Sequence, residues 1–188
     1  MLQNQLKPYS AGLCVVLSLL ACLPVGAQTA PAPSPSATEL FLGYSYLRFN
    51  GQPLGFAGST GLNGGEVGAN FPLLKPWLGL DVDMSGNYGS DLGVTVHSYD
   101  LLAGPQAWYG KGKFRAFGRV LVGAAHDSIS VLGTSNHFAY GAGGGVEANV
   151  HGHIAVRFLQ ADYIRAHGFG ARQNNVRLSA GIVFRWGH

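Results

Sequence analysis

Apolar and polar residues alternate with a period of two along the chain after residue 38. In the clearest window, residues 77–85, the apolar positions are Leu78, Leu80, Val82 and Met84, and the positions between them are Gly79, Asp81, Asp83 and Ser85. The alternation recurs at residues 113–126, 137–149 and 176–186. Successive side chains of a β-strand point to opposite faces, so this period predicts strands with one apolar and one polar face.

The alternation predicts eight strands, at residues 39–49, 61–71, 77–87, 95–108, 113–126, 137–149, 153–165 and 175–186. Most exceed the ~5–6 residues usual in soluble proteins and match the about 9–11 needed to cross a bilayer. Short connections at 72–76, 109–112 and 150–152 alternate with longer ones at 50–60, 88–94, 127–136 and 166–174. This pattern predicts an all-β fold, an eight-stranded antiparallel up-and-down transmembrane β-barrel, in which closure removes every strand edge.

Aromatic residues gather at the strand ends beside the short connections. They form a predicted interfacial girdle of Phe71, Trp77, Trp108, Tyr109, Phe114 and Trp186, which includes all three tryptophans. Amphipathic rings at one level are typical of a membrane–water interface. Lys75, Lys111 and Lys113 lie in or beside the same connections, outside any hydrocarbon.

The charged residues within the strands fall where the lumen should be. By parity, the predicted inward set is Glu66, Asp81, Asp83, Asp100, Glu147, Arg115, Arg119, Arg157, Arg177 and Arg185, five acids and five bases. Buried ions must pair to offset their desolvation, and a balanced set allows this pairing. Because side chains can fill an eight-stranded barrel, the first interpretation is a plugged structural core rather than a conduction path.

Two strands leave the facing of their side chains open. If Arg157 points inward, simple alternation turns Asp162 outward, so either a bulge separates the two or Asp162 stands above the hydrocarbon. The strand at 39–49 carries large apolar residues on both faces.

Composition supports a protein that does not face water over most of its surface. Charged residues make up only 11 % of the 188 residues, against about 25 % in soluble domains, and glycine contributes 29 positions. Aromatics at 11 % exclude a disordered chain. The net charge of +3, without a basic run, gives no electrostatic footprint for nucleic acid.

The N-terminus predicts a signal peptide spanning residues 1–27. Lys7 precedes an apolar run at 11–23, too short to cross a bilayer, and Val25 and Ala27 suit cleavage before Gln28. The competing interpretation is a lipoprotein signal that acylates Cys22. Residues 28–38 form a Pro/Ala/Ser-rich extended segment, which leaves residues 39–188 for the barrel. Both cysteines lie in the leader, so the mature chain is expected to lack thiol chemistry.

The opening segment Phe41-Leu42-Gly43-Tyr44-Ser45-Tyr46 and the closing segment 177–186, which ends in Phe184-Arg185-Trp186, resemble the small outer-membrane β-barrels of the OmpA-like and OmpX-like family. The resemblance covers residues 39–188. It implies recognition of the C-terminal strand by the barrel-assembly machinery, although Gly187 and His188 depart from the usual terminal aromatic. It also implies a barrel without the peptidoglycan-binding domain, and it supplies no shared catalytic residues.

His126 and Ser128 share one strand face and resemble the His-x-Ser pair of outer-membrane lipid A deacylases. A serine nucleophile needs a base, and the base needs an orienting carboxylate. Glu147, the nearest acid on the next strand, is expected to point inward near the opposite rim. A polar strand end is therefore favoured over a catalytic pair.

Three further patterns have simpler structural interpretations. His151 and His153 are expected in a turn on the same side of the barrel as His188, but structural zinc usually takes four ligands. Asp81 and Asp83 suit charge neutralisation of Arg115 or Arg119 better than acid–base catalysis. The glycines at 141–145 match no phosphate-binding motif and are expected to make room for the arginines opposite.

The sequence therefore predicts a non-enzymatic barrel in the bacterial outer membrane, with both termini in the periplasm and no cofactor or metal. Its role would be structural or a surface interaction. The alternatives are a narrow channel for small solutes and, less favoured, a lipid A-modifying hydrolase. The expected partners are outer-membrane lipid and, during biogenesis, the barrel-assembly machinery. No nucleic acid is expected, and the protein should be a monomer.

Overall fold

The computed structural model describes residues 37–56, 58–91, 93–110 and 112–186. The eight strands are β1 (Thr38–Asn50), β2 (Ser59–Pro72), β3 (Leu78–Asp91), β4 (Val94–Tyr109), β5 (Phe114–Ile129), β6 (Gly133–His151), β7 (Ile154–Gly168) and β8 (Ala171–Trp186). A single 3-10 turn, η1 (Gln52–Leu54), lies between β1 and β2. None of the described segments is a helix long and apolar enough to cross a membrane. The predicted signal peptide, the extended segment up to residue 36 and His188 lie outside the described residues.

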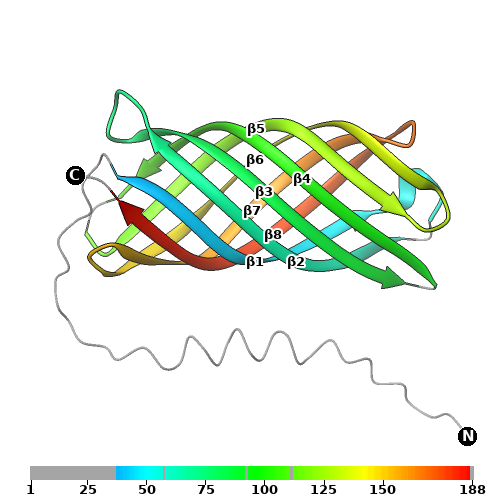
Figure 1. Cartoon of the computed structure of the whole chain (residues 1–188), viewed down its shortest axis with the longest axis horizontal. Coiled ribbons are helices and arrows are strands. Elements are labelled where there is room, and N and C mark those ends of the chain that lie inside the picture. The colour runs from blue at the N-terminus through cyan, green and yellow to red at the C-terminus, as the bar shows by residue number, and fades with distance from the viewer. Residues whose placement is uncertain (1–36, 57, 92, 111, 187–188) are drawn as a thin grey trace, which may run out of the picture.

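The strands form one closed barrel in sequence order, and β1 pairs with both β2 and β8 (Figure 1). Every neighbouring pair is antiparallel. We call the end where β1 begins and β8 ends the terminal end, and the opposite end, where β1 turns into β2, the distal end. Closure leaves no unpaired strand edge, so every strand can bond its backbone on both sides.

The predicted alternation fixes which side chains enter the lumen. On β5, Arg115, Phe117, Arg119 and Leu121 lie on the inner face, while Phe114, Val120 and Val122 are exposed on the wall. On β1, Phe41, Ser45, Leu47 and Phe49 are buried and Leu42, Tyr44 and Tyr46 face outward. Strand one therefore has an inner face as apolar as its outer face.

A bulge in β7 turns Asp162 into the lumen. The register with β8 shifts between Arg157 and Gln160, and the two residues between them, Phe158 and Leu159, both point outward. Arg157 and Asp162 are both buried, at 3 % and 2 % exposure. Of the two explanations that the sequence allows, the bulge is the one found, and it places an acid inside the barrel that simple alternation would turn toward lipid.

The loops predicted at the distal end are wrong for three of the four connections. Residues 88–94, 127–136 and 166–174 were expected to be loops, but pairing continues to Asp91–Val94, Ile129–Gly133 and Gly168–Ala171. These segments are rich in glycine, serine and asparagine, which are typical of loops. Antiparallel strands pair through their backbones, so such side chains do not prevent pairing. The turns need only a glycine of positive φ, which Gly93 and Gly133 supply at 82° and 85°.

Candidate functional site

The ten predicted inward charges all lie on the lumen face. Nine of them are buried, and the side chain of Arg115 is 16 % exposed at the terminal end. Together with Glu39 and Asp162, nine of them form two groups along the barrel, and the tenth, Asp100, accepts a hydrogen bond from Ser85 beside the second group. The terminal ionic layer consists of Glu39, Arg115, Glu147, Arg157 and Arg185, and the central ionic layer consists of Glu66, Asp81, Asp83, Arg119, Asp162 and Arg177.

In the terminal ionic layer, each carboxylate bridges at least two guanidiniums. Arg185 donates from Nε to Oε1 of Glu39 at 2.9 Å, and Arg115 donates from Nε to Oε1 of Glu147 at 2.7 Å. Arg115 also pairs with Glu39, and Arg185 pairs with Glu147. These contacts join strands β1, β5, β6 and β8 across the lumen, so the layer cross-links the barrel wall from inside.

Arg157 lies between two aromatic rings. Its Cζ is 4.4 Å from the ring centroid of Phe41 and 4.2 Å from that of Phe117. Its Nη1 donates to Oε1 of Gln160 at 2.7 Å, and its Nη2 lies 3.5 Å from Glu147. Cation–π contact and an ion pair together compensate a charge that is 3 % exposed.

Arg119 is the hub of the central ionic layer. Its Nε and Nη2 donate to the two oxygens of Asp162 at 3.0 and 2.7 Å, a bidentate pair. Its Nη1 donates to Asp81 at 2.8 Å and to Asp83 at 3.0 Å, and Nη2 reaches Glu66 at 3.2 Å. One guanidinium therefore binds four carboxylates from β2, β3 and β7.

Arg177 is the second cation of the central ionic layer. Its Nη2 lies 2.8 Å from Asp83 and 3.2 Å from Asp162. Its Nη1 donates to Oγ of Ser85 at 2.8 Å, and the Ser85 hydroxyl donates to Asp100 at 3.2 Å. Arg177, Ser85 and Asp100 are all buried, so this chain of contacts links the central ionic layer to β4 inside the lumen.

Sequence parity missed three of the inward acids, Glu39, Asp127 and Asp162. Eight described carboxylates point inward beside five arginines, which corrects the predicted balance of five against five. Glu39 was missed because it opens its strand, and Asp162 because of the bulge. Asp127 was assigned to a loop, but it lies on β5 with Oδ2 3.3 Å from Nε2 of His137.

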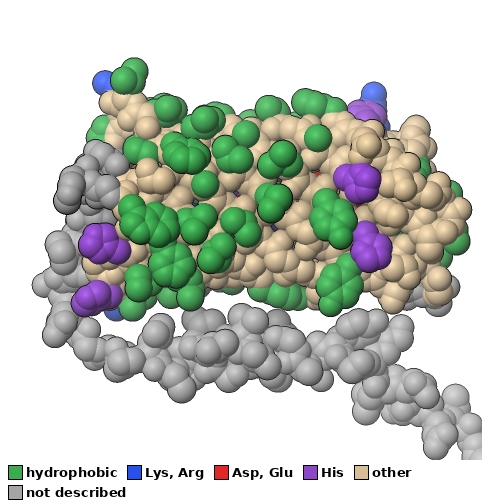
Figure 2. Space-filling view, viewed as in Figure 1, with side chains coloured by type: hydrophobic (Ala, Val, Ile, Leu, Met, Phe, Trp, Pro, Cys, Tyr) green, Lys and Arg blue, Asp and Glu red, His purple; other side chains and the backbone are tan. Residues whose placement is uncertain are grey.

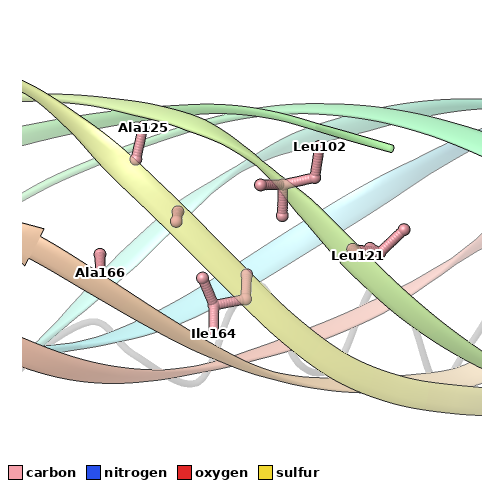
Figure 3. Packing of buried hydrophobic residues seen from close by; sticks show 6 residues of the cluster. Leu102, Leu121, Ala125, Ile164 and Ala166 are labelled. Atoms are coloured by element: carbon pink, nitrogen blue, oxygen red, sulfur yellow. The ribbon is translucent and has the colours of Figure 1, made fainter. Parts of the chain in front are cut away.

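Beyond the central ionic layer, apolar clusters share the lumen with buried polar side chains such as Ser98, Asp127 and Gln173. The distal apolar layer comprises two buried clusters: Leu102, Leu121, Ala125, Ala139, Ile164 and Ala166 (Figure 3), and Leu47, Phe49, Leu62, Val96 and Ile129. Phe56 and Phe169 from the distal connections pack against the second cluster. The sequence did not predict this layer. The large apolar residues on both faces of residues 39–49 could have indicated it, because one of those faces points into the lumen.

Five of the six predicted girdle residues project from the outer wall or turns at the terminal end. Phe71, Trp77, Tyr109, Phe114 and Trp186 are exposed by 47 %, 53 %, 87 %, 58 % and 51 %. Trp108 is the exception, because it lies on the inner face of β4. The Cζ of Arg115 is 5.1 Å from its ring centroid, and its Nε1 is buried. Trp108 therefore lines the terminal mouth of the lumen.

A second set of aromatic residues, which sequence analysis did not single out, lies on the wall toward the distal end. It consists of Tyr44, Tyr46, Tyr88, Tyr99, Tyr140 and Tyr163, all exposed. Hydrophobic side chains cover the wall between the two ends, and histidines border them at either end (Figure 2). Phenol rings combine an apolar body with a polar tip, which suits a membrane–water boundary.

The other candidate residues gather no catalytic or metal-binding set. His126 and Ser128 lie on the outer wall, and the His126 ring hydrogen bonds with Asn136, while Glu147 lies opposite Arg115 at the terminal end. Among the described residues, no three His, Cys, Asp or Glu side chains are placed to hold a metal ion. The glycines at 141–145 were expected to make room for arginines, but the side chains beside them are others. A Cβ on Gly143 would lie 2.1 Å from Asp162, and a Cβ on Gly145 would lie 2.8 Å from Phe117.

No family model and no curated protein matches the sequence. Several solved structures match the fold of this chain. Neisserial surface protein A has a TM-score of 0.63 at 12 % identity, covering 79 % of this chain and 97 % of that one. Ail, the attachment invasion locus protein of Yersinia pestis, has a TM-score of 0.56 at 16 % identity, covering 79 % and 99 %. The chain has the fold of the small outer-membrane β-barrels.

This small outer-membrane barrel fold confirms the architecture that the alternation predicted. At these identities the likeness concerns the fold, and residue roles must come from this chain's own geometry. That geometry is a wall with apolar side chains and a lumen occupied by two ionic layers and one apolar layer.

Proposed function

We propose that the protein is a solute-tight barrel of the bacterial outer membrane with a structural or surface-interaction role. The observation that carries this proposal is the burial of the lumen. Arg177, Asp83, Gln160 and Glu147 are each 0 % exposed, and Glu66 and Arg119 are 2 % and 3 % exposed. A continuous water path would expose the side chains that line it, so a lumen with this burial favours a structural core over conduction.

The outer wall supports placement in a bilayer. Exposed Leu42, Leu80, Met84, Leu101 and Val122 give the wall an apolar middle, and aromatic residues lie toward both ends. Water would not stabilise such a surface, whereas lipid would. Fractionation of cells should place the protein in the outer membrane, and the folded barrel should migrate faster than the boiled chain on a detergent gel. A soluble periplasmic product would contradict the proposal.

We propose that the terminal end faces the periplasm and that the distal end faces outward. The longest connection, residues 51–58 between β1 and β2, lies at the distal end, and bacterial outer-membrane barrels carry their longer loops on the outer side. Cysteine placed at exposed Leu132 should react with a membrane-impermeant maleimide on intact cells, and cysteine at exposed Leu74 should react only after lysis. The opposite labelling pattern would reverse the orientation.

The short connections at the distal end argue against a large binding surface for another protein there. Three of its four connections are tight turns, and only the β1–β2 connection has a longer loop. The wall pair His126 and Ser128 has an amide partner rather than a carboxylate, which supports a non-catalytic barrel. Liposomes containing the refolded protein should not swell in solutions of small sugars, whereas swelling would favour the narrow channel.

A further inference from the structure

The outer wall near the distal end carries positive groups and no described carboxylate. All eight carboxylates whose side chains are described are buried in the lumen, including Asp127 near the distal end. Arg48, Arg165 and Arg172 occupy outward positions on the neighbouring strands β1, β7 and β8. These three arginines, with His167, form what we call the distal basic patch.

The register makes Arg165, His167 and Arg172 neighbours within the distal basic patch. His167 pairs with Arg172, and Arg165 pairs with Asn174, which is two residues from Arg172 on the same face of β8. Arg48 pairs with Val176, the next outward residue after Asn174. Arg165 and Arg172 are therefore diagonal neighbours, about 7–8 Å apart and able to bind one anion together, whereas Arg48 lies two strands from Arg165 and flanks the pair.

The guanidiniums of the distal basic patch have donors available. Nε of Arg172 donates to Nε2 of His167 at 2.9 Å. This contact orients the guanidinium and does not use its two terminal nitrogens, which can donate to a ligand. Nε of Arg165 is buried without a hydrogen-bond partner among the described residues. A buried donor without an acceptor is costly, so an anion that accepts from Arg165 would stabilise this arrangement.

The apolar surface beside the distal basic patch indicates an amphiphilic occupant. Arg48 follows Tyr46 and Arg165 follows Tyr163, each two residues closer to the distal end on the same face. Tyr163 and Val176 are paired in the register and are 49 % and 40 % exposed. A ligand that lies along this wall therefore meets apolar surface first and then the guanidiniums of the distal basic patch.

We propose that the distal basic patch binds the phosphate of a membrane glycolipid such as lipid A, with the acyl chains against the adjoining wall. Arginine presents a planar fork that pairs with two phosphate oxygens. The proposal rests on the bilayer placement proposed above. A soluble polyanion could use the arginines but would gain nothing from the apolar wall, which is why the lipid is favoured.

The test is native mass spectrometry of the mature barrel, refolded in an uncharged detergent and titrated with lipid A that carries both phosphates. The triple variant Arg48→Gln, Arg165→Gln and Arg172→Gln should lose at least about tenfold in affinity, because it removes the three surface charges that attract the anionic lipid. The matched control, Lys75→Gln with Lys113→Gln at the terminal end, should bind as the wild type does.

Three results would overturn the proposal: unchanged lipid A binding by the triple variant, an equal loss in the control, or displacement of lipid A by an equimolar amount of inositol hexakisphosphate. The last result would assign the arginines to a soluble polyanion. Heat-modifiable migration verifies folding of each variant first, and the single variant Arg165→Gln serves if the triple variant does not fold. A barrel that conducts ions but binds lipid A through the patch would refute only the proposed closed lumen.

Discussion

Arg119 and Asp162 form a bidentate pair inside the barrel, with Nε and Nη2 of the arginine 3.0 and 2.7 Å from the two carboxylate oxygens. Arg119 reaches the lumen by simple alternation along β5, whereas Asp162 reaches it through the bulge in β7. The central ionic layer therefore depends on a local irregularity of the backbone as well as on the residues that form it.

Replacement of Arg119 by methionine should destabilise the barrel strongly. The substitution keeps a long side chain but leaves Asp81, Asp83, Glu66 and Asp162 without their shared cation. Breaking a buried ion pair from one side costs about 3–5 kcal/mol. Urea unfolding in lipid vesicles measures the loss. The control Lys75→Met, in an exposed turn, should unfold like the wild type, and equal stability of both variants would contradict the hub role of Arg119.

Deletion of Leu159 should prevent folding into the native barrel. Without the extra residue, β7 cannot keep both Arg157 and Asp162 in the lumen, so one charge must turn toward lipid. Substitution Leu159→Ala keeps the bulge and should preserve heat-modifiable migration. A deletion variant that still shows the folded band, with wild-type stability, would show that the bulge is dispensable.

Two neighbouring glycines should respond differently to a methyl group. A Cβ at Gly143 would lie 2.1 Å from Oδ1 of Asp162 and 2.4 Å from the carbonyl oxygen of Ala161, so Gly143→Ala should cost about 1–3 kcal/mol in the free energy of unfolding. A Cβ at Gly118, on the outer wall, would have its nearest atom at 3.9 Å. Gly118→Ala should therefore be near neutral in the same measurement, and equal losses would contradict the predicted crowding.

The three tryptophans should differ in their contact with lipid. Trp77 and Trp186 are exposed on the outside, while Trp108 lies beside Arg115 at the mouth of the lumen. In variants that retain one tryptophan each, lipids brominated near the headgroup should quench Trp77 and Trp186 and leave Trp108 largely unquenched. Strong quenching of Trp108 would contradict its position in the lumen and place its ring in contact with lipid.

The period-two pattern predicted the barrel because a strand with lipid outside and a lumen inside must alternate its side chains. The same rule found Arg119 and Arg177, and at Asp162 it exposed a conflict of parity with Arg157 that allowed either a bulge or an outward position. The structure has the bulge. Strand ends at the distal side were underestimated because backbone pairing there does not require apolar side chains. Trp108 was assigned by its position near a turn, although its parity on β4 already pointed inward.

The distal apolar layer could not be read from single strands. Leu121 on β5 and Ile164 on β7 belong to one cluster because β6 lies between their strands and the wall curves around the axis. That proximity follows from closure and strand tilt, which no local window contains. Charge pairing partners were unpredictable for the same reason, as with Glu66 and Arg119, which are 53 residues apart.

The closed lumen is tested most directly by single-channel recording of the refolded mature barrel in planar bilayers. The two ionic layers and the distal apolar layer predict no conductance steps, even in concentrated salt, because Arg177 and Asp83 leave no exposed lining. A parallel recording of a known porin verifies the bilayer. Reproducible, ion-selective steps from the folded wild-type protein would contradict the account and favour the narrow channel.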